Sequence, residues 1–293
     1  MALNPWRLRL LADLATYGTV RAVAQHANLS ASAVSQQLAT LERETRAVLL
    51  ERTGRRVRLT AAGVLLAARA REILAAMDAT EAELRGLADE PVGTVTLAAF
   101  QSAIHTLAVP AVARLAERHP DLTVTLVELE PHDSMPALRR GDVDVIITTT
   151  DFTGAELDPA LDLVPITEDT IVLVLPAGHP LAACEAVDLK ACADQRWTFD
   201  MTGSYMSELA TRLCREAGFE PTVICRFNNY LLALRHVERG WSVTLLPSLA
   251  IDPAYQVTTR PLSPPVSRRI TAAVRRPTVS RPEVAAVLTA LRT

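Results

Sequence analysis

The sequence predicts an α/β protein with an α-rich winged helix-turn-helix head, a long linker helix and a body of two α/β subdomains. Three observations predict it: cap residues and helical spacing over the first 45 residues, an apolar seam after residue 61, and alternating strands and helices from residue 93. We expect domains at 1–60, 61–90 and 91–293. Within the body, one subdomain comprises about 91–161 with 267–293, and the other about 162–266.

The composition describes a globular chain with a basic head. The chain has 293 residues, 49% apolar and 22% charged, which allows two domains and excludes a disordered or fibrous protein. Residues 1–60 hold nine arginines and four acids, a net of +5, whereas the whole chain has a net of −3. A basic head on an acidic body is typical of a DNA-binding head with a body that does not bind DNA.

We expect neither a membrane-spanning segment nor a secretory signal in this sequence. No apolar run approaches the roughly 20 residues that span a bilayer, and charged residues interrupt the first 17. We therefore expect a cytoplasmic, nucleoid-associated protein with no membrane partner. The cysteines show no C-x-x-C spacing, so buried reduced thiols are favoured over a redox or metal site. They are Cys184, Cys192, Cys214 and Cys225.

Residues 18–44 predict two short helices joined by a tight turn, after a first helix that Asn4-Pro5 begins and Gly18 ends. Ser30 is a favoured N-cap for the last of these helices, and an apolar stripe at 4-then-3 spacing follows it. The opposite face is small and hydrogen-bonding but uncharged, which suits a helix in the DNA major groove. An ordinary helical hairpin is the alternative. The outward residues are Ala31, Ser32, Ser35, Gln36 and Thr40.

Residues 49–60 predict a β-hairpin wing, with Leu50 and Val57-Leu59 in strands and Thr53-Gly54 in the turn. Four arginines in seven residues are usually a solvated surface. Directly after a helix-turn-helix, however, we expect them to contact phosphates or the minor groove. They are Arg52, Arg55, Arg56 and Arg58.

A long helix follows, with Thr60 as its N-cap. Its apolar residues repeat with spacings of 4 and 3 for about three heptads, and a helix of this length spans roughly 40 Å. Such a seam needs a partner. Packing against the body of the same chain is the alternative, but we favour a two-helix dimer seam because a dimer reads two half-sites. The seam residues are Leu66, Ile73, Met77 and Leu84.

This order of elements resembles the LysR-type transcriptional regulators. Most of the resemblance lies in SASAVSQQLATLE (30–42) and LLERTGRRVRLTAAG (49–63), and it extends over the whole head. The resemblance implies a homodimer or dimer of dimers that binds a palindromic site in double-stranded DNA. It also implies a small effector that switches the promoter, with RNA polymerase as a possible further partner.

The resemblance carries DNA-contacting roles to particular positions. Three positions depart from the family pattern. This chain has Ala31 where many members carry glutamine, and Gln36 where many carry arginine. It has Arg46 in place of the glycine expected after the helix. Glutamine pairs with adenine and arginine with guanine, so the half-site preference is expected to differ. If Arg46 keeps a positive φ, it is strained by roughly 1–2 kcal/mol. The positions expected to contact DNA are Thr19, Arg21, Ser30, Ala31, Ser32, Ser35, Gln36, Gln37, Arg52, Arg55 and Arg56.

From Gly93 the sequence alternates strands and helices, which predicts largely parallel sheets. Residues 162–176 read as two strands, and the chain is expected to turn back near Pro264-Pro265. Crossovers near Thr150-Asp151 and Pro264 would divide two similar halves that close around a ligand. This arrangement resembles periplasmic binding proteins and the effector domain of LysR-type regulators.

Ligands of open α/β sheets bind beyond the carboxyl ends of strands, where helix N-termini favour anions. We therefore expect a small polar or carboxylated effector there. Capping or strand-end solvation is the alternative for each hydroxyl. His105 could reach the pocket, but a helix-surface position is favoured. The expected effector-binding residues are Gln101, Ser102, Thr148, Thr149, Thr202, Phe227 and Asn228.

An enzyme is not expected. The sequence has no G-x-S-x-G, H-E-x-x-H or G-x-x-x-x-G-K motif, and its six histidines and four cysteines are scattered, so no metal or cofactor is expected either. The main alternative is a small-molecule sensor whose winged helix mediates protein contacts instead of DNA binding. A secreted solute-binding protein would require a signal segment before residue 1.

Overall fold

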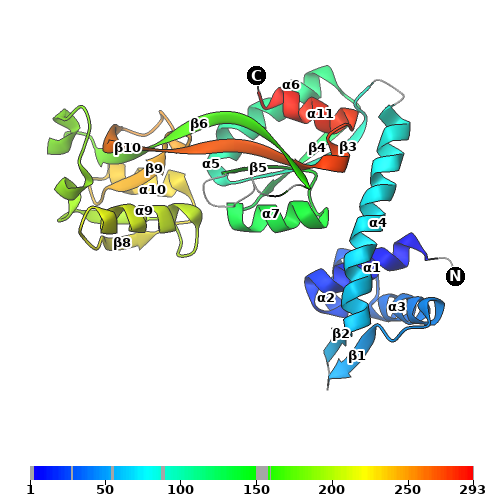
Figure 1. The fold of residues 1–293 in the computed structure, drawn as a ribbon. Helices are drawn as coiled ribbons and strands as arrows, with labels where there is room; N and C mark the ends of the chain where they lie inside the picture. The colour runs from blue at the N-terminus through cyan, green and yellow to red at the C-terminus, as the bar shows by residue number, and fades with distance from the viewer. Residues whose placement is uncertain are drawn as a thin grey trace. The chain divides into compact units, whose positions relative to one another are not determined.

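The computed structural model describes residues 3–27, 29–53, 56–86, 90–149, 158 and 160–292. It divides into two compact units: the head unit, Met1–Ala88, and the body unit, Asp89–Thr293. Figure 1 shows the ribbon of both. In the part of the chain so described, no helix is long and apolar enough to cross a membrane.

The head unit is a helix-turn-helix with a two-stranded wing and a long final helix. The first three helices each begin at a predicted kind of N-cap: Asn4, Thr19 and Ser30 accept backbone hydrogen bonds from the residue three positions on. Gly18 ends the first helix in the left-handed conformation, with φ 70°. The elements are α1 (Pro5–Tyr17), α2 (Val20–His26), α3 (Ala31–Thr45), β1 (Leu50–Thr53), β2 (Arg56–Leu59) and α4 (Ala61–Gly86).

The core of the head unit confirms the predicted apolar stripe of α3. Val34, Leu38 and Leu41 are buried in one cluster with leucines of α1 and with Val23 of α2. Because these residues face inward, the opposite side of α3 faces solvent. The strands β1 and β2 pair antiparallel, as the sequence predicts.

Two contacts attach the wing to the helices of the head unit. The Glu42 carboxylate of α3 accepts hydrogen bonds from the backbone N–H groups of Leu49 and Leu50, at 2.8 and 3.0 Å. Gly63 of α4 lies against the backbone of Leu49, where an added Cβ would stand 2.1 Å from the Leu49 carbonyl oxygen. Only glycine allows the start of α4 to approach the wing this closely.

The body unit contains eight strands and six α-helices in its described residues. The strands are β3 (Gly93–Ala99), β4 (Leu122–Glu128), β5 (Val145–Thr149), β6 (Leu161–Pro176), β7 (Arg196–Phe199), β8 (Thr222–Arg226), β9 (Thr244–Pro247) and β10 (Val257–Arg275). The α-helices are α5 (Gln101–Ala103), α6 (Val109–Arg118), α7 (Pro131–Arg140), α9 (Tyr205–Glu216), α10 (Tyr230–Glu238) and α11 (Pro282–Ala290). A π-helical turn, Ile104–Ala108, joins α5 to α6, and short 3-10 turns occur at Pro180–Ala183, Leu189–Cys192, Ser248–Ala250 and Arg276–Thr278.

The main sheet is mixed, not largely parallel. Its order is β4-β3-β5-β10-β6-β9. Strand β3 pairs parallel with β4 and β5, whereas the pairs β5–β10, β10–β6 and β6–β9 are antiparallel. A second, parallel pair joins β7 and β8. The prediction of two strands in 162–176 was wrong, because β6 is one 16-residue strand. The chain crosses back near Pro264 as expected, but within one strand: β10 continues through this proline, with a break in register between Pro261 and Val266, from the second subdomain to the first.

The long strands β6 and β10 lie side by side and connect two subdomains (Figure 1). The first subdomain has an apolar cluster on each face of β3 and β5, under α6 with α11 and under α7. The second has one core around Trp197, beneath α9 and α10. Because β6 and β10 contribute residues to the cores of both subdomains, they form the connection between them.

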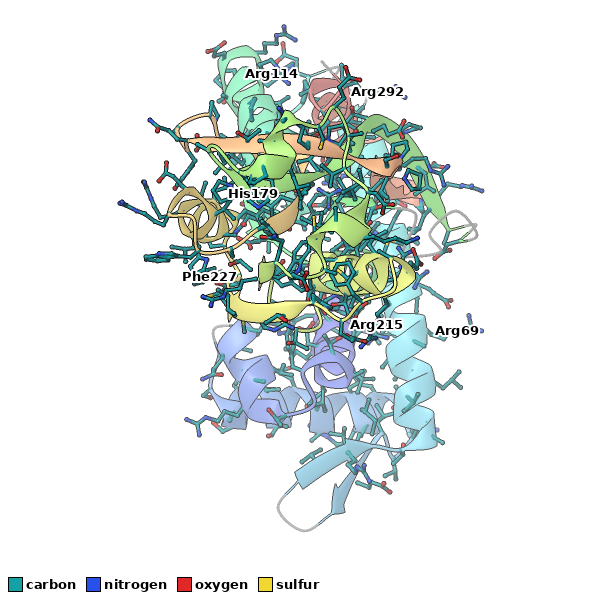
Figure 2. The ribbon with its side chains drawn as sticks, turned by 90° about the vertical axis from the view of Figure 1, so that its left-hand side faces the viewer. Arg69, Arg114, His179, Arg215, Phe227 and Arg292 are labelled. Atoms are coloured by element: carbon teal, nitrogen blue, oxygen red, sulfur yellow. The ribbon has the colours of Figure 1, made fainter. Side chains whose placement is uncertain are left out.

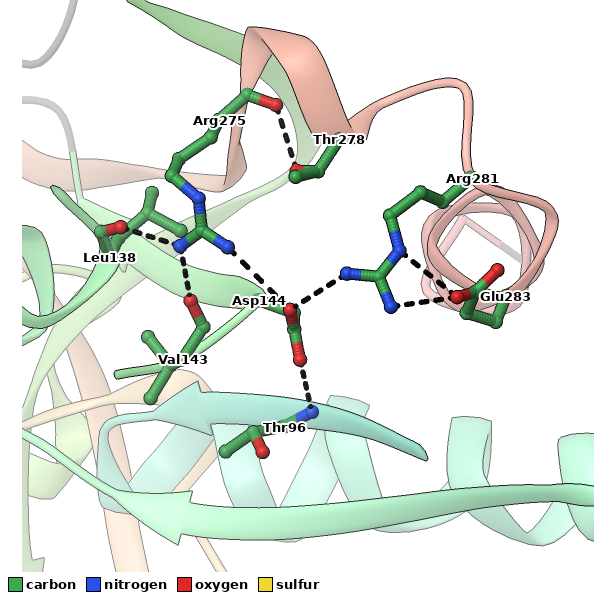
Figure 3. Close-up of polar contacts among 8 residues, drawn as sticks. All are labelled: Thr96, Leu138, Val143, Asp144, Arg275, Thr278, Arg281 and Glu283. Atoms are coloured by element: carbon green, nitrogen blue, oxygen red, sulfur yellow. Dashed lines mark hydrogen bonds and ion pairs between the residues drawn. The ribbon is translucent and has the colours of Figure 1, made fainter. Parts of the chain in front are cut away.

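A polar cluster ties the end of β10 and the C-terminal helix to the first subdomain (Figure 3). The Asp144 carboxylate accepts a hydrogen bond from the Thr96 backbone N–H at 2.9 Å and pairs with Arg281 at 3.2 Å. It also lies 3.6 Å from Arg275, which donates to two backbone carbonyls of α7 and its following turn. Since these groups are largely buried, the cluster fixes α11 against the sheet.

Candidate functional site

The outward face of α3 is the candidate DNA-reading surface of the head unit. Ala31, Ser32, Ser35 and Gln36 are exposed. Two of the hydroxyls make local contacts in the chain without DNA: Ser35 donates to the Ala31 carbonyl at 2.9 Å, and Ser32 contacts the Ser30 hydroxyl at 2.9 Å. Such local bonds are weak enough to exchange for contacts with base edges or phosphates.

Gln37 has a different environment from its neighbours on α3. Its Oε1 accepts a hydrogen bond from Arg7 Nε at 2.9 Å, and the Arg7 guanidinium is also ion-paired with Glu44. Part of the hydrogen-bonding capacity of Gln37 is therefore used to hold α3 against α1. Ser35 and Gln36 are exposed, whereas Gln37 is partly buried.

The flanks of the reading helix carry the remaining predicted contact residues. Thr19 and Arg21 are exposed, and the Thr19 hydroxyl caps α2 by accepting from the Ala22 N–H at 3.1 Å. Arg58 on β2 is exposed. Arg52 and Arg56 lie on the paired strands of the wing, and their side chains, like the whole of Arg55, fall outside the described part of the structure.

The predicted seam of α4 is used in two ways. Leu66 packs against the core of the head unit, and Ala67 and Ala70 are buried in that core. Further along, Ile73 and Met77 are 37% and 40% exposed, one turn apart. The side chain of Leu84 is outside the described set. Arg69, labelled in Figure 2 and one turn before Ile73, forms an exposed ion pair with Glu72. The first turns of α4 therefore pack one side on the core of the head unit, whereas packing on the body was the alternative to a partner helix. Among the described side chains of α4, Val64, Leu65, Ile73 and Met77 are exposed and apolar, and the last two belong to the predicted seam.

In the body unit, Gln101 connects the two subdomains beside two cavities. Its Oε1 accepts from the Tyr230 backbone N–H at 2.8 Å, and its Nε2 donates to the Asn228 carbonyl at 3.1 Å. The cavities have volumes of about 250 and 390 Å³, and Gln101, Glu128 and Tyr230 line both. The larger cavity lies within the range of roughly 300–1,000 Å³ that is typical of a small-ligand site.

A buried arginine, Arg268, contacts the wall of the smaller cavity through Ser102. The Arg268 guanidinium donates to Ser102 Oγ at 2.8 Å and pairs with the Asp169 carboxylate at 2.8 Å. It is 2% exposed and lies over the Phe100 ring, 4.6 Å from the centroid. Asp169 in turn accepts from the Ser248 hydroxyl and the Leu249 N–H. A charge pair buried this completely requires all of these partners, so it fixes the position of Ser102 at the cavity wall.

The cavity walls are acidic. Glu128 and Asp252 line the smaller cavity, and Glu128, Glu130 and Asp200 line the larger one, where Glu130 accepts a hydrogen bond from the Tyr205 N–H at 3.3 Å. Burial raises the pKa of both Glu130 and Asp200 above the ordinary carboxyl range. His105 lines the smaller cavity and His132 the larger, and no arginine or lysine is among the described lining residues.

The structure brings some of the predicted effector-binding residues together and separates others. Gln101 and Ser102 line the smaller cavity, and Gln101, Thr202 and Asn228 line the larger one. Thr148 and Thr149 are completely buried, and the Thr148 hydroxyl has no hydrogen-bond partner among the described atoms. Phe227, labelled in Figure 2, packs edge-on against His236 and lines neither cavity.

Sequence reasoning missed the acidic residues and Tyr230. Glu128, at the end of β4, could have been found, because it obeys the same strand-end rule that selected Gln101 after β3. Asp200 likewise follows β7, a four-residue strand that the sequence analysis did not identify. Arg268 carries no such signal, because it stands in the middle of β10, far from Ser102 in sequence.

Two protein-family models match the chain. The LysR substrate binding domain matches residues 88–293, and the bacterial regulatory helix-turn-helix protein of the lysR family matches residues 6–64. Together they cover both the α3 surface and the cavities. No group of three or more side chains suited to a metal ion occurs among the described residues.

Individual proteins show the same relationship. A probable hydrogen peroxide-inducible genes activator of Mycobacterium leprae is 30% identical over 244 residues, covering 83% of this chain and 77% of the relative. Full-length OxyR from Pseudomonas aeruginosa has a similar fold, with a TM-score of 0.71 at 21% identity, covering 99% of this chain and 98% of that one. The LysR family regulator CbnR in complex with its target DNA is also similar in fold, with a TM-score of 0.57 at 21% identity, covering 99% of each chain. The chain therefore belongs to the LysR family of DNA-binding transcriptional regulators.

Proposed function

We propose that the chain binds a palindromic promoter site as a homodimer or dimer of dimers, and that a small molecule in the cleft of the body unit switches transcription. Each expected domain has one role in this proposal: residues 1–60 bind DNA, residues 61–90 join the protomers, and residues 91–293 bind the effector. Ile73 and Met77, exposed on α4, support a partner helix. Contact with RNA polymerase belongs to the same proposal.

DNA is preferred over a protein as the ligand of the winged helix. The match of residues 6–64 to a DNA-binding family model supports this choice, together with the net charge of +5 in residues 1–60. The exposed face of α3 is small and rich in hydrogen-bonding groups, which suits base edges. A protein-binding surface would instead favour large apolar or aromatic side chains.

The effector is a small polar molecule that carries a positive charge. The observation behind this proposal is the acidic lining of the two cavities: Glu128, Glu130, Asp200 and Asp252, without arginine or lysine among the described residues. A carboxylated effector, which the strand-end and helix-terminus rule favoured, would face these carboxylates at close range and in a partly buried site. An ammonium or guanidinium group would instead offset their charge.

A thermal-shift screen on the full chain tests the effector proposal. The probes are putrescine, agmatine and L-arginine, against succinate and glutamate at equal ionic strength. A cation that binds the folded chain raises its melting temperature in a concentration-dependent manner, whereas the dicarboxylates leave it unchanged. A shift with the dicarboxylates alone would overturn the proposed charge of the effector.

DNA footprinting tests the rest of the proposal separately. The full chain should protect an interrupted palindrome in the intergenic DNA beside its own gene, with half-sites about one or more helical turns apart. Binding should weaken steeply with salt, because arginine contacts to phosphate release counterions. Failure to protect any such site at low salt would contradict the DNA-binding role, whatever the result of the thermal-shift screen.

The mycobacterial relative is named a probable hydrogen peroxide-inducible genes activator, and the cysteines of this chain differ in how well they are suited to react with peroxide. Cys192 and Cys214 are completely buried, and burial raises the pKa of these thiols to about 11 and about 12. Since the thiolate is the nucleophile, neither thiol is suited to react with peroxide. The effector proposal therefore does not use these two cysteines.

A further inference from the structure

Outside the effector cavities, four side chains of the second subdomain form a polar cluster around a thiol. Thr198 and Cys225 are paired neighbours on the parallel strands β7 and β8. His236 projects from α10, and Ser242 precedes β9. Cys225 Sγ lies 3.2 Å from His236 Nε2, so a nucleophile and a base are in hydrogen-bond contact.

The hydroxyl groups hold the imidazole in place from its other side. His236 Nδ1 lies 2.8 Å from Ser242 Oγ and 3.0 Å from Thr198 Oγ1, and the two hydroxyls are 2.8 Å apart. When Nδ1 carries the ring proton and donates it to a hydroxyl, Nε2 is left to accept the thiol proton. Burial lowers the pKa of His236, so the neutral ring that can accept a proton predominates at neutral pH.

The surroundings leave this pair accessible. Cys225 and His236 are both partly exposed, whereas Thr198 and Ser242 are buried beneath them. The His236 ring is flanked edge-on by Phe227 and by Trp241, which is 60% exposed. The thiol therefore lies near the surface while its proton acceptor is held by buried partners.

The other cysteines have different environments. Cys192 and Cys214 are completely buried in the core around Trp197. Cys184 is exposed, in the segment that follows a 3-10 turn. Exposure alone would therefore make Cys184 the most reactive thiol of the chain, whereas a positioned base would favour Cys225.

We propose that Cys225 is a thiol-modification site of this regulator, oxidised by small hydroperoxides with His236 as proton acceptor. His236 Nε2 takes the thiol proton while the sulfur attacks one peroxide oxygen and the O–O bond breaks. The departing hydroxide takes the proton from the imidazolium and leaves as water. One thiol and one hydrogen peroxide thus yield one sulfenic acid and one water. This site is independent of the proposed effector.

The position of Cys225 connects the modification to the effector cleft. Phe227 lies two residues along the chain and contacts the His236 ring, and the next residue, Asn228, accepts the Gln101 hydrogen bond from the first subdomain. An oxygen added to Cys225 Sγ displaces the His236 contact. The end of β8 and its bond to Gln101 are the nearest elements to respond.

Thiol labelling of the full chain tests the proposal without DNA or effector. The rate of alkylation by limiting iodoacetamide is measured for each cysteine by peptide mass spectrometry, and dimedone traps sulfenic acid after treatment with hydrogen peroxide. We expect Cys225 to alkylate faster than Cys184 and to be the main dimedone adduct. His236→Gln should slow alkylation of Cys225 at least tenfold and leave the rate of Cys184 unchanged.

Ser242→Ala is a second variant, which keeps the imidazole but removes one partner of Nδ1, and should slow Cys225 by a smaller factor. Circular dichroism confirms that each variant is folded. The comparison of the alkylation rates of Cys225 and Cys184 is made in the wild-type chain, so it does not depend on the folding of any variant. Faster alkylation of Cys184 than of Cys225 would overturn the proposal. An unchanged Cys225 rate in a folded His236→Gln variant would also overturn it.

Discussion

The Gln101 side chain accepts a hydrogen bond from the backbone N–H of Tyr230 at 2.8 Å and so joins the two subdomains of the body unit. The same amide donates to the Asn228 carbonyl at 3.1 Å. One side chain thus binds the backbone on both sides of the start of α10. Because it also lines both cavities, Gln101 is placed to couple ligand binding to the contact between subdomains.

Replacing Gln101 with alanine should weaken the contact between subdomains. Two hydrogen bonds are lost, each with a net contribution of about 1 kcal/mol, so the free energy of unfolding of the body unit should fall by about 1–2 kcal/mol. Urea denaturation followed by circular dichroism measures this loss. The matched control is Gln101→Glu, which keeps an acceptor for the Tyr230 N–H but places a second carboxylate oxygen against the Asn228 carbonyl. An unchanged midpoint for the alanine variant would contradict the role of Gln101.

The two partly buried carboxyl groups of Glu130 and Asp200 predict a specific pH dependence. Burial raises the pKa of Glu130 and Asp200, so the folded chain holds these protons more tightly than the unfolded chain. Each group therefore favours the folded state as the pH falls through its folded pKa, and disfavours it above that pKa. Glu130→Gln should thus not lower stability near neutral pH, as thermal denaturation at several pH values would show.

The same groups should control binding of a cation. Binding requires ionised carboxylates, so the melting-temperature shift caused by agmatine or putrescine should decrease as the pH falls into the raised pKa range. Asp200→Asn should reduce the shift near neutral pH by removing one charge. Asp133→Asn on the exposed side of α7 is the matched control, because Asp133 lines neither described cavity. Equal loss in both variants would indicate a nonspecific charge effect.

The positions of Gln36 and Arg52 in the head unit predict two different roles in DNA binding. Gln36 is exposed on the reading face of α3, and Arg52 lies on the wing strand β1. Arg52→Ala should weaken binding to every sequence and reduce the salt slope by about 1, whereas Gln36→Ala should cost about 1–3 kcal/mol at one base pair and relax preference there. Gel shifts over a panel of operator variants measure both. The same loss at every operator for both variants would contradict these roles.

The predictable part of the fold is the part with local signals. Ser30 as N-cap and the stripe Val34, Leu38 and Leu41 depend on residues a few positions apart, and both placed α3 correctly. The predicted hairpin is also present, although Thr53 belongs to strand β1 and Gly54 lies outside the described residues. The sequence could not show that β6 continues through Pro165. Proline lacks a donor and suggests a break, but β10 accommodates it with a shift in register between Ile270 and Thr271.

Tertiary contacts account for most of what the sequence did not reveal. The apolar spacing of α4 required a partner, but it did not specify that Leu66 packs on the head's own core while Ile73 remains exposed. The acidic cavity is assembled from the end of β4, the segment after β7 and the start of α10. Its charge therefore appears only when these separate segments meet.

Gly63 predicts a steric effect at the junction of the wing and α4. An alanine Cβ would lie 2.1 Å from the Leu49 carbonyl oxygen, and this backbone atom cannot move aside as a side chain could. Helix propensity favours alanine by about 1 kcal/mol, whereas overpacking costs typically 1–3 kcal/mol and here displaces the start of β1. We expect Gly63→Ala to lower both the urea midpoint and the affinity for DNA. The control is Ala62→Ser, an added atom at the exposed neighbouring position.

Arg46 provides the opposite case, a residue whose replacement by glycine should stabilise the head unit. It ends α3 with φ 53° and ψ 33°, and is the single non-glycine residue with positive φ in the described structure. This conformation costs an L-residue about 1–2 kcal/mol, and the greater freedom of glycine in the unfolded chain offsets about 0.5–1 kcal/mol of the gain. Arg46→Gly should therefore raise the free energy of unfolding by up to about 1 kcal/mol.

A series at position 46 separates strain from charge. Arg46→Ala removes the positive charge but keeps the Cβ, so it should not stabilise the chain. Arg46→Asn should fall between alanine and glycine, because asparagine tolerates the left-handed conformation better than other L-residues. The strain explanation requires the order glycine, asparagine, alanine in urea midpoints. If alanine stabilises as much as glycine, the charge of Arg46 is responsible, and its backbone conformation is not.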